Sequence, residues 1–269
     1  MLGLANLGNT CYINSVLQSL RYIRPFVFSV RDVQYSHNSS IIPSFIELLF
    51  ANCDMKYLNE FVLKLSRSNR EFQIMRQCDA HELFLYVIDR LYEELPSLPN
   101  VFRGNFKSNI LCGHCQHNSV TNTPFLTVSL DLKMGDQMVT DLLTKFEEGE
   151  TIEGFDCEHC KRKTKAEKHM SIEQSPTILT LHLKRFIGMH KNNSNIILEH
   201  EISLRKERYT FIGAINHVGN IGYGHYTAVC MRHDDKSYVL CNDRSVEPLS
   251  LPKSSSLAYV LFYQKIKGI

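Results

Sequence analysis

The chain has 269 residues, 43% of them hydrophobic, which is enough to bury a full core and excludes a disordered chain. Lys and Arg number 30 against 28 Asp and Glu, so the formal net charge of +2 lacks the basic excess of a dedicated nucleic-acid-binding protein. The N-terminus has neither the basic segment nor the apolar run of a secretory signal, and no stretch reaches the ~18 apolar residues of a membrane span. We therefore expect a soluble, intracellular protein, cytoplasmic or nuclear, with no membrane and no nucleic-acid partner.

The nine cysteines agree with that compartment, because their number is odd and four of them form two CxxC pairs, a metal pattern rather than a disulfide framework. We expect the thiols to be reduced. Outside the pairs, Cys53, Cys78, Cys230 and Cys241 stand in apolar or periodic surroundings and are expected to be packing residues. Cys11 has a different context.

The first predicted element is a helix that begins near Cys11, in the segment NLGNTCYINSVLQSL. A polar turn with a glycine precedes the cysteine, and the apolar residues that follow have helical spacing. Free backbone N–H groups and the positive end of the helix dipole would stabilise a thiolate there and lower its pKa. Cys11 is therefore a candidate nucleophile; the alternative is a small buried hydrophobe after a turn.

Three more helices are predicted up to about residue 95, which makes the first third a helical lobe. The clearest pattern lies in QCDAHELFLYVIDRL, where apolar residues recur at spacings of three and four. Weaker periodicity covers Pro43 to Ala51 and Tyr57 to Leu65, with polar turns at Ser36 to Ser40 and Ser66 to Arg70.

The two CxxC pairs give the strongest signal from spacing alone. They supply four thiolates in two tight knuckles, with 41 residues between the pairs. This length suggests two hairpins of an extended β-ribbon, clamped at their tips by one structural Zn²⁺ without a catalytic opening. The expected ligands are Cys112, Cys115, Cys157 and Cys160. His114 and His159, inside the knuckles, are alternative ligands that we expect to point outward.

A basic run, CKRKTKAEKH, follows the second knuckle, and acidic residues precede it. Mixed charge on an extended ribbon is usually a solvated face. Phosphate binding is the alternative, but the run lacks the interleaved aromatic residues of a nucleic-acid stacking platform.

Strand patterns dominate the rest of the chain, beginning with the alternating segment Phe125 to Leu132. Because helices come first and strands later, we expect an α+β enzyme with segregated layers. Beyond Pro176 the predicted strands are Ile178 to Phe186, Tyr209 to His217, His225 to Met231, Tyr238 to Cys241 and Tyr259 to Gln264.

His225 enters one of these strands in GYGHYTAVC, after two glycines that permit close approach of a backbone or a substrate. A thiol protease needs a histidine to accept and return the proton. The next strand ends in CNDRSV, where Asn242 or Asp243 could orient the imidazole across a hairpin. Taken alone, Asn-Asp-Arg-Ser is simply a turn.

Together these motifs resemble one family. NLGNTCYINSVLQSL resembles the cysteine box of ubiquitin-specific proteases, and GYGHYTAVC with CNDRSV resembles their histidine box. The segments QCDAHELFLYVIDRL, Pro124-Phe125-Leu126 and LHLKRF, and the CxxC pairs, follow in the family's order. The resemblance implies a single papain-like catalytic domain, 1–269, shaped like a hand. Its parts would be a thumb (1–95), zinc-bearing fingers (105–175) and a β-rich palm (96–104 and 176–269).

The resemblance also implies roles for individual residues. Cys11 would be the nucleophile, His225 the general base and Asn242 the third triad member, with Asp243 as its competitor. Asn6 would donate to the oxyanion, although alone it looks like a turn residue.

Four further residues are expected to contact ubiquitin: Gln18, Asp79, Gly224 and Tyr226. Asp79 resembles the carboxylate that meets the basic C-terminal tail of ubiquitin, and its alternative role is that of a helix N-cap.

The expected function is a deubiquitinating thiol isopeptidase that cleaves after the C-terminal glycine of ubiquitin and acts on ubiquitinated proteins. Because the cysteine box begins within ten residues of Met1, no accessory domain is expected before it, and targeting or activation would come from a protein partner. The alternatives are a protease for a ubiquitin-like modifier, an inactive ubiquitin-binding module and a zinc-ribbon scaffold.

Overall fold

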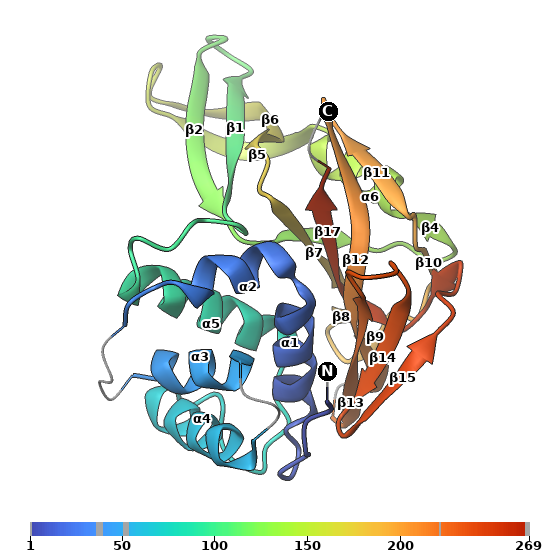
Figure 1. Cartoon of the computed structure of the whole chain (residues 1–269). Coiled ribbons are helices and arrows are strands. Elements are labelled where there is room, and N and C mark those ends of the chain that lie inside the picture. Colours follow the sequence, from blue (N-terminus) through green and yellow to red (C-terminus); the bar gives the residue numbers. More distant parts are fainter. Residues whose placement is uncertain (1, 36–39, 51–53, 221, 267–269) are drawn as a thin grey trace.

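The helices gather in the N-terminal third of this computed structural model, and the strands form a separate layer (Figure 1). The structure describes residues 2–35, 40–50, 54–220 and 222–266. The turn expected at 36–40, the end of the helix expected at 43–51, and Cys53 therefore lie wholly or partly outside the described residues.

The helical lobe is built around α1, whose residues are all buried. One side of this helix contacts α3 and α5, and the other side lies against β13 of the large sheet. The helices predicted from periodicity are confirmed, whereas α2, which starts directly after α1 with a proline in its first turn, was not predicted. The bounds are α1 Cys11–Tyr22, α2 Arg24–Arg31, α3 Ile42–Phe50, α4 Met55–Ser68 and α5 Ala80–Glu94.

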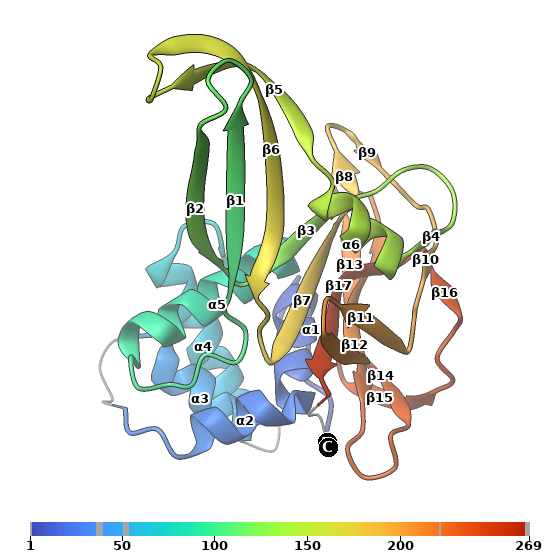
Figure 2. The same cartoon turned by 90° about the horizontal axis from the view of Figure 1, so that it is seen from above.

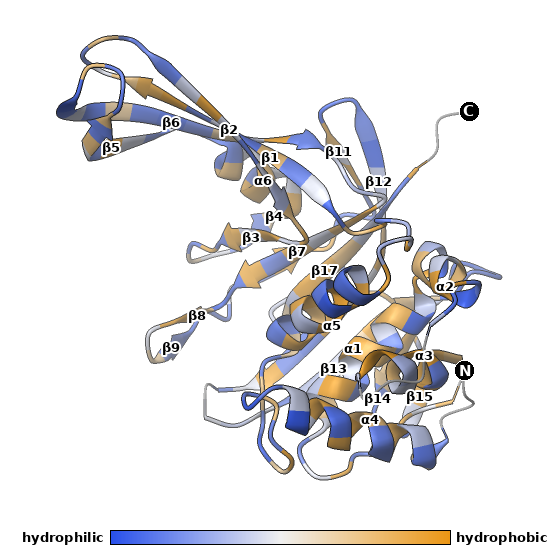
Figure 3. Cartoon of the chain, turned by 90° about the vertical axis from the view of Figure 1, so that its left-hand side faces the viewer, coloured by the Kyte–Doolittle hydropathy of each residue, from blue (hydrophilic) through white to orange (hydrophobic). Residues whose placement is uncertain are grey.

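A four-stranded antiparallel ribbon in the order β2-β1-β6-β5 projects from the body of the protein (Figure 2). It consists of two hairpins joined along β1 and β6, as the CxxC spacing predicts. Hydrophilic residues cover much of it, while apolar residues concentrate where the helices meet the large sheet (Figure 3). The bounds are β1 Gly104–Cys112, β2 Asn118–Phe125, β5 Glu150–Cys157 and β6 Arg162–Gln174.

The large sheet has the order β15-β14-β13-β12-β17-β7-β3, with β11 paired to β12. Its pairs are antiparallel except that of β3 with β7. The predicted strands are confirmed to within a few residues. The bounds are β3 Val128–Asp131, β7 Ile178–Lys184, β11 Glu201–Leu204, β12 Glu207–Gly219, β13 Gly224–Met231, β14 Tyr238–Asn242, β15 Ser245–Leu249 and β17 Ala258–Lys265.

Part of the segment expected in the fingers, 105–175, packs with the large sheet instead. Strand β3 pairs with β7, and α6 contacts β3 and β11 as well as β6. The chain thus leaves the ribbon after β2 and returns to it at β5. The remaining elements are α6 Val139–Glu147, the small sheet of β4 Gln137–Met138, β10 Ile196–Ile197 and β16 Ser254–Ser255, and the hairpin of β8 Phe186–Ile187 with β9 His190–Lys191.

Aromatic packing joins the helical lobe to the sheet. The ring of Phe84, in α5, packs edge-on against two other rings. Its centroid lies 5.3 Å from that of Phe102, which precedes β1, and 5.6 Å from that of Phe262 in β17. All three are essentially inaccessible to solvent, and burying such a side chain contributes about 2 kcal/mol. This interface fixes α5 against the large sheet, which also carries part of the site described below. Within the described residues, no helix is long and apolar enough to cross a membrane.

Candidate active site

Cys11 is the first residue of α1, and its side chain is 3% exposed. The N-cap residue, Thr10, makes no side-chain cap to the helix; its hydroxyl accepts from the N–H of Leu7 at 2.9 Å instead. The thiol therefore lies at an uncapped helix N-terminus, where the sequence places it.

The pKa of the Cys11 thiol is raised, not lowered. Burial is the largest cause, and the nearby Asp243 carboxylate adds to it. Hydrogen bonds from the backbone N–H groups of Tyr226, Tyr12 and Cys11 itself lower the pKa but do not outweigh burial. The expectation of a thiolate formed by the helix N-terminus alone is thus wrong for this state, and the thiol needs a base to remove its proton.

His225 and Asn242 lie side by side at the adjacent ends of β13 and β14. Ala228 pairs with Cys241, so the alternation of side chains puts His225 and Asn242 on one face of the sheet. Asn242 Oδ1 is 2.7 Å from His225 Nε2. An amide oxygen only accepts hydrogen bonds, so Nε2 carries the proton and Nδ1 keeps a free electron pair. His225 is also next to Tyr226, whose N–H contacts the Cys11 thiol.

Asp243 turns away from the imidazole. Its φ of +47° lies in the left-handed region, which Asp tolerates better than most residues. Its Oδ1 accepts from Asn14 Nδ2 at 2.7 Å and its Oδ2 from Asn6 Nδ2 at 2.9 Å, while its carbonyl accepts from the N–H of Leu4 at 2.8 Å. The carboxylate thus ties the N-terminal segment to α1.

Asn6 is exposed and rigidly held in the turn before Cys11. Its Oδ1 accepts from the N–H groups of Gly8 at 3.0 Å and Thr10 at 3.1 Å. One hydrogen of its amide goes to Asp243, and the amide has a second one to offer. The side chain therefore stabilises the turn through its oxygen and can also donate a hydrogen bond through its amide nitrogen.

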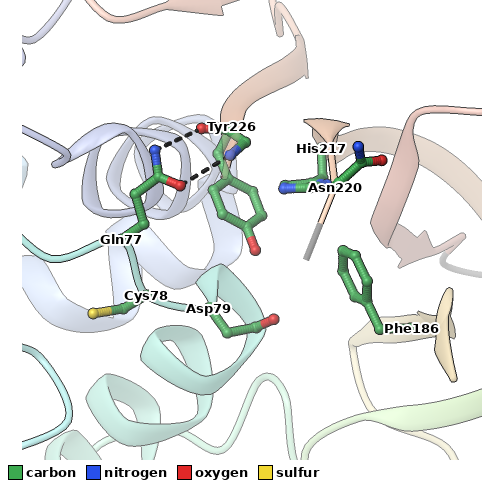
Figure 4. A pocket seen from close by; sticks show the side chains of 8 residues that line it. Gln77, Cys78, Asp79, Phe186, His217, Asn220 and Tyr226 are labelled. Carbon is green, nitrogen blue, oxygen red and sulfur yellow. Dashed lines mark hydrogen bonds between the residues drawn. The ribbon is translucent and has the colours of Figure 1, made fainter. Parts of the chain in front are cut away.

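A pocket of about 270 Å³ adjoins this group of residues between the helical lobe and the sheet (Figure 4). Asp79 and Tyr226 line it, as does Gly224. The remaining lining residues are not among the site residues predicted from the sequence. Gln77 and Phe186 lie in motifs that carry the family resemblance, whereas no motif includes His217. The lining residues are Gln77, Cys78, Asp79, Phe186, His217, Asn220, Gly224 and Tyr226.

Asp79 has the alternative role expected of it, because it caps α5, and it also borders the pocket. Its Oδ1 accepts from the N–H groups of His81 at 2.7 Å and Glu82 at 3.1 Å, and Oδ2 accepts from the hydroxyl of Tyr259 at 2.6 Å. Tyr226 is 7% exposed, and burial raises the pKa of its hydroxyl, so it stays protonated.

One expected ubiquitin contact needs correction. Gln18 is 1% exposed and donates to the carbonyl of Leu2 at 3.0 Å, so its side chain faces the interior rather than a docking partner. The contact expected of Gly224 stays a prediction: this residue lines the pocket, and its backbone N–H and carbonyl are both bonded to the side chain of Gln77. The helical spacing of Gln18 was compatible with either face of α1, whereas the Gln77 contact joins residues far apart in sequence.

His217 is a buried histidine that lines the pocket. It is 4% exposed, and its Nδ1 has no hydrogen-bond partner among the described residues. Burial, followed by the charge of Lys191, lowers its pKa to about 4. The imidazole is therefore neutral at neutral pH.

The four cysteines of the CxxC pairs meet at the tip of the ribbon. Their sulfur atoms all lie within 4.8 Å of one another, with Cys112 to Cys160 at 4.0 Å and Cys115 to Cys157 at 3.7 Å. A tetrahedral site with metal–sulfur bonds of 2.3 Å needs sulfur atoms about 3.8 Å apart. The cluster could therefore hold a metal ion.

The histidines inside the knuckles contact other residues. His114 Nε2 lies 2.7 Å from Arg162 Nη1, and the ring of His159 stacks on His117. Among the cysteines expected to be packing residues, Cys230 and Cys241 are buried in the core, whereas Cys78 is half-buried and lines the pocket.

The sequence of the chain is similar to those of several ubiquitin carboxyl-terminal hydrolases. Ubiquitin carboxyl-terminal hydrolase 23 of Arabidopsis thaliana is 29% identical over 97% of this chain, and hydrolase 36 of Drosophila erecta is 28% identical over 97%. This chain spans only 35% and 28% of the lengths of those relatives. Hydrolase 12 of Salmo salar is 28% identical, over 97% of this chain and 89% of its own length.

Among solved structures, the chain resembles one from the SAGA Ubp8/Sgf11/Sus1/Sgf73 DUB module bound to ubiquitin aldehyde. The TM-score is 0.84 at 23% identity, over 99% of this chain and 70% of the other. This likeness shows the fold, so the expected α+β, hand-like class is confirmed. The model of the ubiquitin carboxyl-terminal hydrolase family matches residues 2–263, and the chain therefore belongs to that family.

Proposed function

We propose that the chain is a deubiquitinating thiol isopeptidase that hydrolyses the bond after the C-terminal glycine of ubiquitin. The observation that carries the proposal is the His225–Asn242 pair beside the N-terminus of α1, where Cys11 lies. Membership of the family supports the activity, and a structural neighbour is described as bound to ubiquitin aldehyde.

In the first half of the reaction, His225 Nδ1 takes the proton of the Cys11 thiol as the sulfur attacks the glycine carbonyl carbon. The carbon–sulfur bond forms and the carbonyl electron pair moves onto oxygen. When this intermediate collapses, the carbon–nitrogen bond breaks and the leaving amine takes the proton from His225. The product is a thioester, and general acid–base transfer of this kind contributes about 10²- to 10⁴-fold in rate.

In the second half, water attacks the thioester while His225 takes its proton. The carbon–sulfur bond then breaks, and the proton returns to Cys11. Both halves place negative charge on the former carbonyl oxygen. The second hydrogen of the Asn6 amide is the side-chain donor that we assign to this charge, and one such donor stabilises the transition state by about 3 kcal/mol.

The raised pKa of Cys11 fits this scheme. A buried thiol that stays protonated in the free enzyme reacts only when a base is aligned with it. Asn242 fixes the tautomer and orientation of the imidazole but brings no negative charge to stabilise imidazolium. Asp243 holds Asn6 and Asn14, so its proposed role is to position the oxyanion side.

We assign Zn²⁺ to the four-cysteine cluster at the tip of the ribbon, where it would crosslink the two hairpins and take no part in the reaction. The division into thumb, fingers and palm is proposed with β3 and α6 moved from the fingers to the palm. We further propose ubiquitinated proteins as substrates, an intracellular location in cytoplasm or nucleus, and an activating protein partner. The Ubp8 neighbour is described in a module with Sgf11, Sus1 and Sgf73.

An electrophilic ubiquitin probe tests the proposal. The probe should label one site, identified as Cys11 by mass spectrometry, and Cys11→Ala should abolish labelling and hydrolysis. The variant should keep the thermal unfolding temperature and the affinity for ubiquitin, because it removes one sulfur from a turn fixed by Asn6 and Thr10. Turnover by Cys11→Ala, or a wild-type protein that binds ubiquitin without being labelled, would contradict the mechanism. Probes built on ubiquitin-like modifiers would separate the alternative substrate class.

A further inference from the structure

The side chain of Gln77 bridges the two walls of the pocket. Its Oε1 accepts from the N–H of Gly224 at 2.9 Å, and its Nε2 donates to the carbonyl of Gly224 at 3.0 Å (Figure 4). A carboxamide offers the same donor and acceptor as a peptide bond, so Gln77 pairs with Gly224 as a neighbouring strand would. The contact joins the loop before α5 to β13, across 147 positions of sequence.

This bridge lies on the approach to the nucleophile. Gly224 is two residues before Tyr226, whose N–H contacts the Cys11 thiol. Two residues of extended chain span roughly 7 Å. A polypeptide tail that enters the pocket and presents its last carbonyl to Cys11 therefore passes the bridge with its last two residues.

The wall on the sheet side cannot move back to make room. A Cβ added to Gly224 would lie 2.1 Å from His217 Nε2, and His217 is 4% exposed. The His217 ring packs against Tyr226 at 4.7 Å and Phe186 at 5.2 Å between centroids.

The opposite wall is also fixed. Two positions after Gln77, Asp79 caps α5 and accepts the hydroxyl of Tyr259 at 2.6 Å. Between these two fixed walls, the side chain of Gln77 spans the space to Gly224 with its two hydrogen bonds and narrows the opening there.

We propose that the Gln77–Gly224 bridge is a strap that sets the width of this channel and that Gln77 is a specificity-determining residue. With the strap closed, only residues without a side chain pass at the last two positions of the tail. The inference rests on the proposed function, which supplies the reaction and a tail that ends in glycine.

The test uses full-length ubiquitin with a fluorophore amide at its C-terminus, and two versions in which the last or the penultimate glycine is alanine. We expect the wild type to prefer glycine strongly at both positions. In Gln77→Ala the ratio of kcat/KM between the alanine and glycine substrates should rise at least tenfold. Gln77→Glu keeps the length but cannot donate to the Gly224 carbonyl, so its ratio should lie between the two.

Gln73→Ala is the matched control. Gln73 is an exposed glutamine of the same loop, and it donates to the carbonyl of Ser66 at 3.3 Å. This variant should keep the wild-type ratio. Thermal unfolding of each variant verifies the fold.

An unchanged ratio in Gln77→Ala would overturn the strap, whether the activity on the glycine substrate rises or falls. An equal gain in Gln73→Ala would also overturn it, since the loop as a whole would then set the width. A wild type that hydrolyses none of the substrates would refute the proposed function, and the strap with it.

Discussion

The two neighbouring residues Asn242 and Asp243 have different partners in the candidate active site. Asn242 is the last residue of β14 and meets His225, while Asp243 has left the strand with a positive φ and meets Asn6 and Asn14. Because Asp243 lies past the end of β14 in the left-handed region, its side chain diverges from that of Asn242, so one side chain orients the base and the other holds the donor.

This division gives different expectations for the two residues. Asn242→Ala removes the acceptor that fixes the imidazole tautomer, and kcat should fall by about 10²-fold or more. Asn242→Asp restores an acceptor at the same position and should keep much of the activity. Asp243→Ala should lower kcat through the unanchored Asn6. The rate of Cys11 alkylation by iodoacetamide, which forms no oxyanion, should not fall, because loss of the carboxylate removes one cause of the raised pKa of the thiol.

Steady-state kinetics and alkylation rates, with unfolding curves to verify the fold, measure these effects. Normal turnover by Asn242→Ala, together with an inactive but folded Asp243→Ala, would exchange the two assignments.

At the scale of elements, the exposed ribbon has little core of its own. Most residues of β2 and β5 are exposed or half-exposed, and the tips of both hairpins end at the cysteine cluster. Ion pairs across the ribbon, such as Lys165 with Glu153, are largely exposed and screened by solvent, so they contribute little to the stability of the ribbon. A bound metal is therefore expected to dominate the stability of the ribbon tip.

We expect one equivalent of zinc per chain by elemental analysis of the purified protein. Cys112→Ser should lose the metal, expose the hairpin tips to protease and weaken ubiquitin binding more than the reactivity of Cys11. His114→Ala is the control, since His114 lies in the same knuckle but contacts Arg162. Soluble, active wild type with well under one equivalent of zinc would refute the assignment.

The elements that follow from local pattern could be predicted from the sequence. The periodicity of α5 and the strand-forming composition of β12 and β13 are local, and the spacing of the CxxC pairs indicates how two hairpin tips meet. Two other features depend on how distant segments pack: the parallel pairing of β3 with β7 and the Gln77–Gly224 contact. No local sequence pattern predicts them. The pKa of Cys11 is a similar case, because the degree of burial at a helix N-terminus is a tertiary property.

At the scale of the whole molecule, a histidine pair helps to join the helical lobe to the large sheet. His81 of α5 stacks on His182 of β7 with ring centroids 3.8 Å apart. His81 Nε2 lies 3.0 Å from Thr127 Oγ1, and His182 Nδ1 lies 3.0 Å from Ser129 Oγ. Two charged imidazoles could not stack at this distance without strong repulsion, so the interface requires that the two rings are not both protonated.

Burial lowers the pKa of His81 to about 4, against an opposing effect of Asp79, and that of His182 to about 3, helped by the charges of His81 and Lys184. His217 behaves likewise, with a pKa of about 4. In the unfolded chain all three titrate near 6.5, so below that pH the unfolded state binds more protons and the free energy of unfolding falls.

We therefore expect the protein to lose stability as the pH falls from about 6.5 towards 4. The loss at pH 5.5 should be on the order of 1 kcal/mol for each of the three histidines. Urea unfolding at pH 7.5 and pH 5.5 measures it. His182→Asn removes one of the three groups, so its free energy of unfolding should depend less on pH than that of the wild type, even if the variant is less stable at both values. His190→Gln, at an exposed position of β9, should keep the wild-type pH dependence. A wild type equally stable at both values would mean that the histidines are protonated in the folded state, and the lobe and the sheet would then have to be joined without the neutral pair.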